Sequence, residues 1–292
     1  MVAEGHGMAG AGMGAPCPLL DGGDHPRSRG EGRGMKRVRV GVIPAAGKGG
    51  RISPLGRILP KPMLPVLDRP ILEFILRRMV YEFGVEEVYL IVERLGGLVQ
   101  NYFKDGRDFG VRIKYVRQRQ PRGIAHAVSL TSRYIREPFL VILGDDFTLG
   151  SAKGLMKKFR EKNAGAVEAV IREKDRDILR KTCCVTIDSA GMIRRIVEKP
   201  SRPMSDIRGC GLYLFDPMVF DYIKKTPRSS GRQEVEITDT IGLMAREGRA
   251  FAAFIRGNNI NINTPDDLVR ANMMFVRMSG DLSGPFWGRR GR

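Results

Sequence analysis

Short apolar runs alternate with helical patterns of apolar residues once the chain passes residue 35. Four of the runs are short and rich in Val and Ile, as buried parallel strands are. They span residues 38–43, 88–92, 112–116 and 139–143. Between them, apolar positions recur at helical spacing, and helices are predicted near residues 70–83, 97–104 and 123–134. This alternation predicts an α/β fold with a Rossmann-like, doubly wound, mostly parallel sheet.

The second half of the chain has a different pattern. Residues 184–197 predict a β-hairpin, because Asp188 to Gly191 supply turn residues between two apolar runs. Helices are predicted near residues 216–225, 237–247 and 265–277. No internal repeat is visible in the sequence, and no hexapeptide pattern predicts a C-terminal β-helix.

Composition separates three parts of the chain. Residues 1–35 are rich in Gly, Ala and Met and are predicted to be a disordered tail, with Met35 as a possible translation start. Residues 36–278 are expected to form a single domain. Residues 279–292 are expected to be a frayed basic tail.

The most informative segment follows the first predicted strand. It runs from Ala46 to Arg51 as Ala-Gly-Lys-Gly-Gly-Arg, and Lys61 follows ten residues later. Glycines let the backbone approach a ligand and turn its N–H groups inward, and such turns bind anions. Arg51 can hold phosphate oxygens with its bidentate fork, and Lys61 adds a point charge. The segment therefore predicts a polyphosphate-binding loop at the carboxyl end of a strand.

This loop matches neither of the common phosphate-binding motifs. A P-loop carries Lys and then Ser or Thr directly after its second glycine, and no such sequence follows Gly50. A dinucleotide-binding loop opens a helix, whereas a proline follows here within a few residues. Prolines remove N–H donors and disfavour helix before them, so this segment is predicted to stay extended and non-helical. They are Pro54, Pro60, Pro62 and Pro65.

With these residues the chain resembles the sugar-1-phosphate nucleotidylyltransferases, over roughly residues 36–275. The signature of that family has a Gly-rich turn ending in Arg, a Lys between prolines, and Leu-Pro-Val, which stand here as Ala46 to Arg51, Pro60 to Pro62 and Leu64 to Val66. Further motifs follow in the order of the family. They are Arg117-Gln118, Gly123, His126 to Val128, Leu143 to Asp146, Glu198 to Pro200 and Glu234 to Asp239. The motifs are most similar to those of UTP–glucose-1-phosphate uridylyltransferases and glucose-1-phosphate thymidylyltransferases.

The resemblance implies an enzyme that joins UTP or dTTP to a hexose-1-phosphate, such as glucose-1-phosphate, and releases pyrophosphate with the help of Mg²⁺. It implies that the second half forms a small hairpin and helical insertion that binds the sugar, and that the protein is a homo-oligomer. The implied catalytic residues are Arg51, Lys61 and Asp145. The implied nucleotide-binding residues are Ala46, Gly47, Gly49, Gly50, Gln118 and Gly123. The sugar phosphate would contact Glu198, Lys199 and Gly211, and Mg²⁺ would bind Asp145 and Asn261.

Three residues depart from the pattern of the family. Gly50 replaces the usual Thr before the arginine. Cys183 and Cys184 stand where the family usually has a Gly-Val pair that touches the sugar, so the sugar pocket is expected to be crowded or reshaped. Asn261 replaces the second metal-binding Asp of a W-x-D-x-G-T-type segment. An amide oxygen can bind Mg²⁺ but adds no charge, so weaker Mg²⁺ binding is expected.

Alternatives remain at this point. A regulatory homologue that binds a nucleotide sugar without catalysis would fit the two departures at Cys183 and Asn261, and the same chemistry could use another nucleotide or sugar phosphate. The net charge of +18 also fits nucleic-acid binding, although the basic residues are spread along the chain without interleaved aromatics.

Cysteine usage and hydropathy favour a cytoplasmic protein. The four cysteines (Cys17, Cys183, Cys184 and Cys210) form no C-x-x-C pair and the chain has 3 His, so a zinc site is poorly supported and reduced thiols are expected. No apolar run is long enough to span a bilayer.

Overall fold

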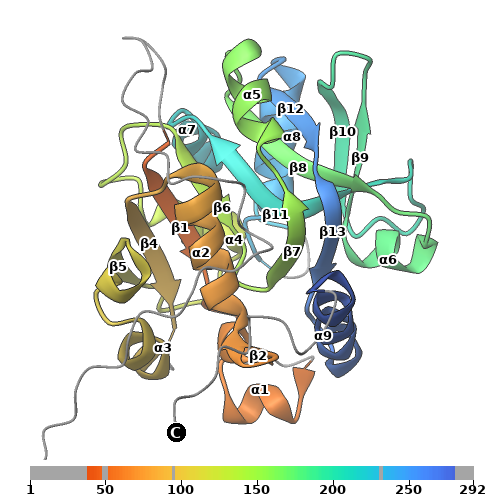
Figure 1. The fold of residues 1–292 in the computed structure, drawn as a ribbon. Helices are drawn as coiled ribbons and strands as arrows, with labels where there is room; N and C mark the ends of the chain where they lie inside the picture. The colour runs from red at the N-terminus through yellow and green to blue at the C-terminus, as the bar shows by residue number, and fades with distance from the viewer. Residues whose placement is uncertain (1–37, 48–51, 94–95, 230–232, 280–292) are drawn as a thin grey trace, which may run out of the picture.

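The computed structural model describes residues 38–47, 52–93, 96–229 and 233–279, which form one sheet with helices on both faces (Figure 1). Seven strands follow each other across the sheet in the order β10-β9-β11-β6-β1-β4-β5, and β8 pairs with both β11 and β12. The strands of this nine-stranded sheet are β1 (Val40–Pro44), β4 (Glu87–Val92), β5 (Arg112–Arg117), β6 (Phe139–Ile142), β8 (Ala166–Arg172), β9 (Cys183–Ile187), β10 (Ile193–Glu198), β11 (Ile207–Phe215) and β12 (Ala250–Phe254).

The four strands predicted from the first half form the parallel core of the sheet. β1 pairs in parallel with β4 and β6, and β4 pairs in parallel with β5. The α/β class with a parallel core is therefore confirmed. The sheet becomes mixed beyond β6, because β11 runs antiparallel to β6, β8 and β9. All nine residues of β11 are buried. A buried backbone needs hydrogen-bond partners, and β11 finds them in the strands that flank it.

Helices cover both faces of the sheet, and alternate strand residues point to opposite faces. One cluster of buried apolar side chains packs Ile43 and Leu90 against α2, α3, α5 and α9. The other packs Val42 and Tyr89 against α4, α7 and α8. The helices are α1 (Leu55–Ile58), α2 (Ile71–Phe83), α3 (Gly96–Phe103), α4 (Ile124–Ser129), α5 (Gly154–Glu161), α6 (Arg176–Lys181), α7 (Val219–Lys225), α8 (Ile237–Arg246) and α9 (Pro265–Ser279).

Two helix predictions need correction. The helix expected at residues 123–134 ends at Ser129, because Ser129 and Thr131 donate side-chain hydrogen bonds to carbonyls three residues back and compete with the helix for them. The proline-rich segment is not wholly extended either. It holds the single turn α1 after Pro54 and a 3₁₀ turn, Lys61–Met63. Proline is tolerated at the first turn of a helix, where no N–H is needed.

The predicted hairpin is present as β9 and β10. β9 pairs with β10 and also with β11, so the hairpin extends the edge of the main sheet. This attachment brings the end of β10 to the same region as the ends of the parallel strands.

Two further strand pairs place segments beside the sheet. β7 (Asp146–Ser151) pairs with β13 (Arg256–Asn261), and β2 (Pro65–Val66) pairs with β3 (Arg69–Pro70). In the first pair Asn261 lies opposite Asp146, which brings the segment before α9 to the end of β6.

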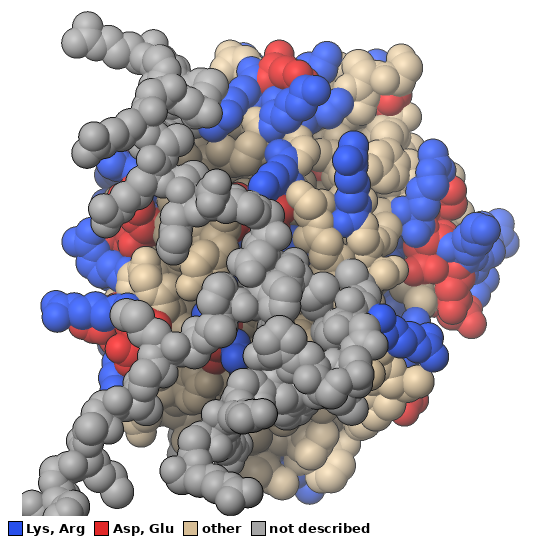
Figure 2. All heavy atoms as spheres, viewed as in Figure 1, with Lys and Arg blue, Asp and Glu red and all other residues tan. Residues whose placement is uncertain are grey.

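The charged side chains are mixed over the face shown in Figure 2. Outside the grey atoms, Lys and Arg lie in several separate places and Asp and Glu lie among them, rather than in one basic stripe. Several charged side chains of the described residues are paired, as in Arg172 with Asp206 and Arg194 with Asp188. Within the described ranges, no helix is long and apolar enough to cross a membrane.

Candidate functional site

A cavity of about 390 Å³ opens at the carboxyl ends of the parallel strands and reaches the end of the β9–β10 hairpin. Every predicted site residue within the described ranges lines it. These are Ala46, Gly47, Lys61, Gln118, Gly123, Asp145, Glu198, Lys199, Gly211 and Asn261. The remaining predictions, Gly49, Gly50 and Arg51, lie outside the described residues.

The floor of the cavity is formed where β1 and β6 end. The N–H of Ala45 donates to the carbonyl of Ile91 in β4, and the N–H of Gly144 donates to the carbonyl of Pro44. A Cβ at Gly144 would lie 2.9 Å from that carbonyl oxygen, so a glycine is needed for this approach. The loop after β1 and the turn after β6 are thereby held side by side.

One end of the cavity is lined by Gln118, the residue that follows β5. Its side-chain nitrogen lies 3.4 Å from the carbonyl of Gly123 and 2.9 Å from Nδ1 of His126. A carbonyl can only accept, so the amide nitrogen faces both groups and His126 accepts at Nδ1. Burial and the charges of Arg122 and Arg228 lower the pKa of His126, which favours this neutral form. Gln118 is thus left with an amide oxygen that has no partner among the described residues.

Gly123 has a backbone conformation and surroundings that exclude a side chain. Its φ is +94°, and a Cβ would lie 2.4 Å from the carbonyl oxygen of Val235. Backbone hydrogen bonds join the two segments, since Ala125 donates to Val235 and Val235 donates to Arg122. This contact brings Glu234 and Glu236 into the cavity wall, two residues that were not predicted to belong to the site.

The hairpin end of the cavity carries Glu198 and Lys199 at the end of β10. The ammonium of Lys199 lies 2.7 Å from one oxygen of Glu198, and the hydroxyl of Thr238 donates to the other oxygen at 3.0 Å. Lys199 has a φ of +46°, a conformation that is costly for a residue with a Cβ. Its N–H donates to the carbonyl of Thr182, which holds the two strands together here. Lys181 and Thr182 also line this end and were not predicted.

Cys183 lies in the cavity wall, next to a buried acid. Its thiol donates to Oε1 of Glu168 at 3.2 Å, and Glu168 lies on β8, on the other side of β11, with 1% of its surface exposed. Burial raises the pKa of Glu168 to about 8 and that of the Cys183 thiol well above its usual value. A Cβ at Gly209 would lie 2.0 Å from the same Glu168 oxygen, so the glycine makes room for the acid.

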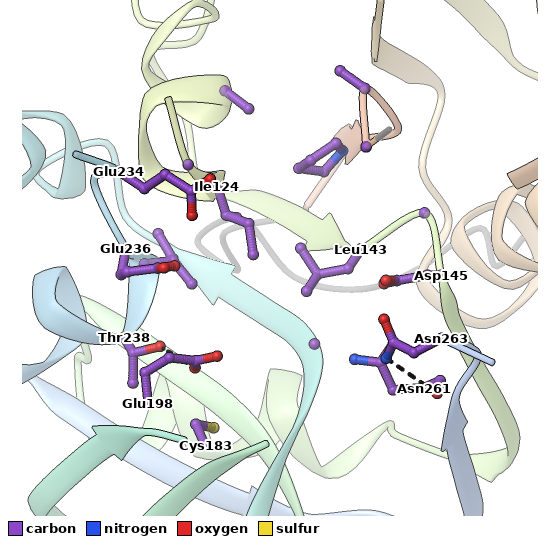
Figure 3. Close-up of a pocket in the computed structure, with 18 of the residues that line it drawn as sticks. Ile124, Leu143, Asp145, Cys183, Glu198, Glu234, Glu236, Thr238, Asn261 and Asn263 are labelled. Carbon is purple, nitrogen blue, oxygen red and sulfur yellow. Dashed lines mark hydrogen bonds between the residues drawn. The ribbon is translucent and has the colours of Figure 1, made fainter. Parts of the chain in front are cut away.

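The opposite wall carries the predicted metal ligands (Figure 3). Nζ of Lys61 lies 2.5 Å from Oδ2 of Asp145 and 2.9 Å from Oδ1 of Asn263. The side-chain nitrogen of Asn263 lies 2.9 Å from Oδ1 of Asn261. Asn263 was not a predicted site residue, because an Asn in a polar loop gives no signal by itself.

Only one of the two adjacent aspartates faces the cavity. Asp146 is 2% exposed and accepts hydrogen bonds from Thr148 at 2.6 Å and from Asn259 at 2.7 Å. Burial raises the pKa of Asp146 to about 7. Asn259 in turn accepts from the buried Arg208 at 2.6 Å, so Asp146 belongs to a polar network beneath the site.

The donor set of this wall fits Mg²⁺ only in part. Asp145 and Asn261 supply hard oxygen donors of the kind that Mg²⁺ prefers, while the side-chain oxygen of Asn263 accepts from Lys61. No group of three or more His, Cys, Asp or Glu among the described residues could hold a metal. Protein atoms would therefore supply few ligands, and waters or phosphate oxygens would have to complete the coordination, as is usual for Mg²⁺.

Comparison with known proteins places the chain in the nucleotidyl transferase family, whose model matches residues 40–277. Two of its relatives are named UTP–glucose-1-phosphate uridylyltransferases, and the chain is a sugar-1-phosphate nucleotidyltransferase. The family prediction made from the motifs is confirmed.

Two curated archaeal relatives and one solved structure illustrate the likeness. The chain is 35% identical to a UTP–glucose-1-phosphate uridylyltransferase of Haloferax volcanii, over 77% of this chain and 92% of that protein. It is 30% identical to a low-salt glycan biosynthesis nucleotidyltransferase of the same organism, over 81% of this chain and 66% of that protein. The structure of a UDP-glucose pyrophosphorylase complexed with UDP-glucose aligns with a TM-score of 0.74 at 24% identity, covering 82% of this chain and 99% of that one. At this identity the structural likeness supports the fold alone.

Proposed function

We propose that the protein is a Mg²⁺-dependent nucleotidylyltransferase that joins UTP, or dTTP, to a hexose-1-phosphate, in the first instance glucose-1-phosphate. The products are a nucleotide sugar and pyrophosphate. The observation that carries the proposal is the placement of Lys61 against Asp145 at one wall of the cavity that Gln118, Glu198 and Lys199 line elsewhere. Residues far apart in the sequence thus meet where two phosphorylated substrates would have to meet.

In this reaction the protein positions the substrates and neutralises their charge, and it forms no covalent bond with either of them. A phosphate oxygen of the sugar phosphate attacks the α-phosphorus of the nucleotide in line, and pyrophosphate leaves. The ammonium of Lys61 uses two of its three donors on Asp145 and Asn263, which leaves one for an α-phosphate oxygen. Lys199 would pair with the phosphate of the sugar, and Glu198 would accept sugar hydroxyls, with Gly211 beside them.

The loop after β1 completes this arrangement in the proposal. The backbone from Ala46 through Gly47, Gly49 and Gly50 would approach the triphosphate, and Arg51 would hold the departing pyrophosphate. Asp145 and Asn261 would hold Mg²⁺, which when bound neutralises the phosphate charge as a Lewis acid.

Gln118 supports a choice of nucleotide. Because its amide nitrogen is occupied by Gly123 and His126, its free oxygen can only accept a hydrogen bond. Uracil and thymine present an N–H at ring position 3, whereas cytosine presents an acceptor there. With CTP, the acceptor at ring position 3 would face the oxygen of Gln118, which is also an acceptor. This contact therefore favours UTP or dTTP over CTP.

The structure constrains the identity of the sugar phosphate less than that of the nucleotide. Cys183 and the neutral Glu168 behind it reshape the end of the cavity next to Glu198. The same chemistry with a different sugar phosphate is therefore the second candidate, and Cys183 is the observation that favours it.

The test is pyrophosphate release by the full-length protein with Mg²⁺, glucose-1-phosphate and each of UTP, dTTP, CTP, ATP and GTP. Release with UTP or dTTP is expected, with a loss of about 100-fold or more in Asp145→Ala. Asp221→Ala, which changes an exposed aspartate of α7, serves as the matched control. Release with CTP alone would contradict the assignment of Gln118. Absence of release would direct the assay to other sugar phosphates.

Three wider assignments belong to the same proposal. Residues 36–278 form one catalytic domain, in agreement with the family match over residues 40–277. Cys183, Cys184 and Cys210 are buried free thiols, which suits a reducing cytoplasm. The partners are the nucleotide, the sugar phosphate and further copies of the chain, with no nucleic acid and no membrane.

A further inference from the structure

Asn263 joins Lys61 to Asn261, one of the two predicted metal ligands, on the same wall of the cavity. Its side-chain oxygen accepts from Lys61 at 2.9 Å, and its side-chain nitrogen donates to Oδ1 of Asn261 at 2.9 Å and to the Asn261 carbonyl at 3.4 Å. Figure 3 shows Asn263 between Asp145 and Asn261, with the bond to Asn261 dashed. No other described side chain contacts both Lys61 and Asn261 by a hydrogen bond.

The orientation of these amides follows from what each group can donate. An ammonium has donors only, so the oxygen of Asn263 must face Lys61 and its nitrogen must face Asn261. Asn261 must then present its oxygen, because two amide nitrogens cannot bond to each other without an acceptor. The oxygen of Asn261 keeps a second lone pair for a cation. Asn263 thus orients the Asn261 amide so that its oxygen, and not its nitrogen, is available to a cation on this wall.

The backbone of Asn263 is itself held by the start of α9. The carboxylate of Asp267 accepts from the N–H of Asn263 at 3.0 Å and from the N–H of Thr264 at 2.9 Å. The N–H of Asp267 donates back to the hydroxyl of Thr264 at 3.2 Å. This reciprocal pair is a capping box, which fixes the chain at the residue before the helix. Because its backbone is held in this way, the side chain of Asn263 can reach both Lys61 and Asn261.

Asn263 also limits how Lys61 can move. Lys61 and a divalent cation would compete for Asp145, since a carboxylate so close to an ammonium is already partly neutralised. When the cation takes Asp145, the bond to Asn263 still retains the ammonium near the phosphates. Without Asn263, Lys61 would have Asp145 as its only anchor and would oppose the cation there.

We propose that Asn263 is a positioning residue that sets the metal affinity of the wall through Asn261 and keeps Lys61 in place for the phosphate. This inference rests on the proposed function for the role of Lys61 in turnover, but its effect on metal binding does not need turnover. Asn263 is not a catalytic residue, because it acts through its two partners.

The first test measures Mn²⁺ binding without substrates, by electron paramagnetic resonance, on the full-length protein. Asn263→Ala is expected to bind Mn²⁺ about tenfold more weakly than wild type, the usual cost of removing a partner that orients a ligand. Asn101→Ala, which changes an exposed asparagine of α3, is the matched control and should bind as wild type. Circular dichroism and thermal unfolding show that each variant is folded. Equal Mn²⁺ affinity in folded Asn263→Ala, or a wild type that binds no Mn²⁺, overturns the inference.

A double-mutant cycle then separates the two arms of the proposal. If Asn263 acts on the metal through Asn261, Asn263→Ala costs less Mn²⁺ affinity in an Asn261→Ala background than in wild type, and the loss that remains comes from Lys61, which then has Asp145 as its only anchor. A fully additive loss overturns that route. In turnover, Asn263→Ala is expected to lower kcat about tenfold while the KM for the sugar phosphate stays within about twofold. If the loss of Mn²⁺ affinity is seen but wild type turns over no substrate, the proposed function fails and this inference on the metal stands.

Discussion

At the scale of single residues, Glu168 is unusual because it is a buried carboxyl group without an ion-pair partner among the described residues. It is a carboxyl in the interior with one hydrogen bond, from Cys183, and its other oxygen has no partner in the described part of the chain. Burial raises its pKa to about 8, so the group is largely neutral at neutral pH. Its space is provided by Gly209, whose Cβ would otherwise collide with it.

Glu168→Gln should make stability less dependent on pH. The folded pKa of about 8 lies above the reference value of 4.5, so the folded state keeps a proton that the unfolded state loses between these values. The contribution of Glu168 is therefore fully present below pH 4.5 and is lost as pH rises toward 8. Urea unfolding at pH 5, 6.5 and 8 measures it, and the free energy of unfolding should fall less steeply in the variant.

The control for this experiment is Glu161→Gln, which changes an exposed glutamate of α5 and should leave the slope unchanged. Some slope will remain in Glu168→Gln, because Asp146 also has a pKa raised by burial, to about 7. Parallel pH curves for wild type and Glu168→Gln would show that Glu168 titrates as an ordinary carboxyl.

The adjacent aspartates show what sequence decides at this scale and what it does not. The pair after a buried strand predicted a metal-binding strand end, and Asp145 does line the cavity. Asp146 turns to the opposite side and bonds with Thr148 and Asn259. Asp145 lies in the turn after β6 and Asp146 begins β7, so the turn, and the side chains packed on each side of it, decide which of the two faces a ligand.

At the scale of elements, the start of α9 is a small unit with a defined energetic role. Thr264 and Asp267 satisfy each other's N–H groups, and Asp267 also accepts from Asn263. The hydroxyl of Thr264 accepts a bond that the helix itself cannot provide at its first turn.

Thr264→Ala is expected to lower the free energy of unfolding by about 1 kcal/mol, because the capping hydroxyl is lost while the helix keeps its apolar contacts. Chemical denaturation with urea measures the change. Ser201→Ala, in an exposed loop, is the control and should stay within about 0.5 kcal/mol of wild type. If the two variants were equally stable, the capping box would carry no net stabilisation in this protein.

Helices and strands with a strong apolar periodicity were predictable from the sequence. Strands that form because they pair with another strand were not. The parallel strands and α2 lie within two residues of their predicted bounds, because their apolar periodicity is local. β13 was missed, since Arg-Gly-Asn-Asn-Ile-Asn has few β-formers and becomes a strand by pairing with β7. β11 was missed because Gly209 and Gly211 interrupt its apolar run, and its pairing irregularity lies there.

At the scale of the whole molecule, one cavity connects segments from both halves of the chain. The end of β1 and the segment before α9 are more than 200 residues apart, and Lys61 bonds to Asn263 across 202 positions. A ligand that bridges these segments binds only the folded protein, so it should stabilise the whole domain.

UTP with Mg²⁺ should therefore raise the midpoint of thermal unfolding. At a ligand concentration of about 100 Kd the stabilisation is about 2.7 kcal/mol. Removal of Mg²⁺ with EDTA should reverse much of the shift, because Asp145 and the phosphates would then repel each other. Differential scanning calorimetry measures it, and Asp145→Ala should lose the part that depends on Mg²⁺. A shift of equal size with EDTA present would show that the cavity binds nucleotide without a metal.

The sequence by itself determined the parallel core, the hairpin, the family and part of the list of residues that line the cavity. Those features depend on local periodicity and on motifs whose order is written along the chain. The tertiary structure alone decided that the hairpin joins the main sheet, that Asp146 is buried while Asp145 is not, and that Asn263 connects Lys61 with Asn261. These outcomes depend on pairing and hydrogen bonding between segments far apart in the chain, and such contacts leave no periodic signal in the residues that make them.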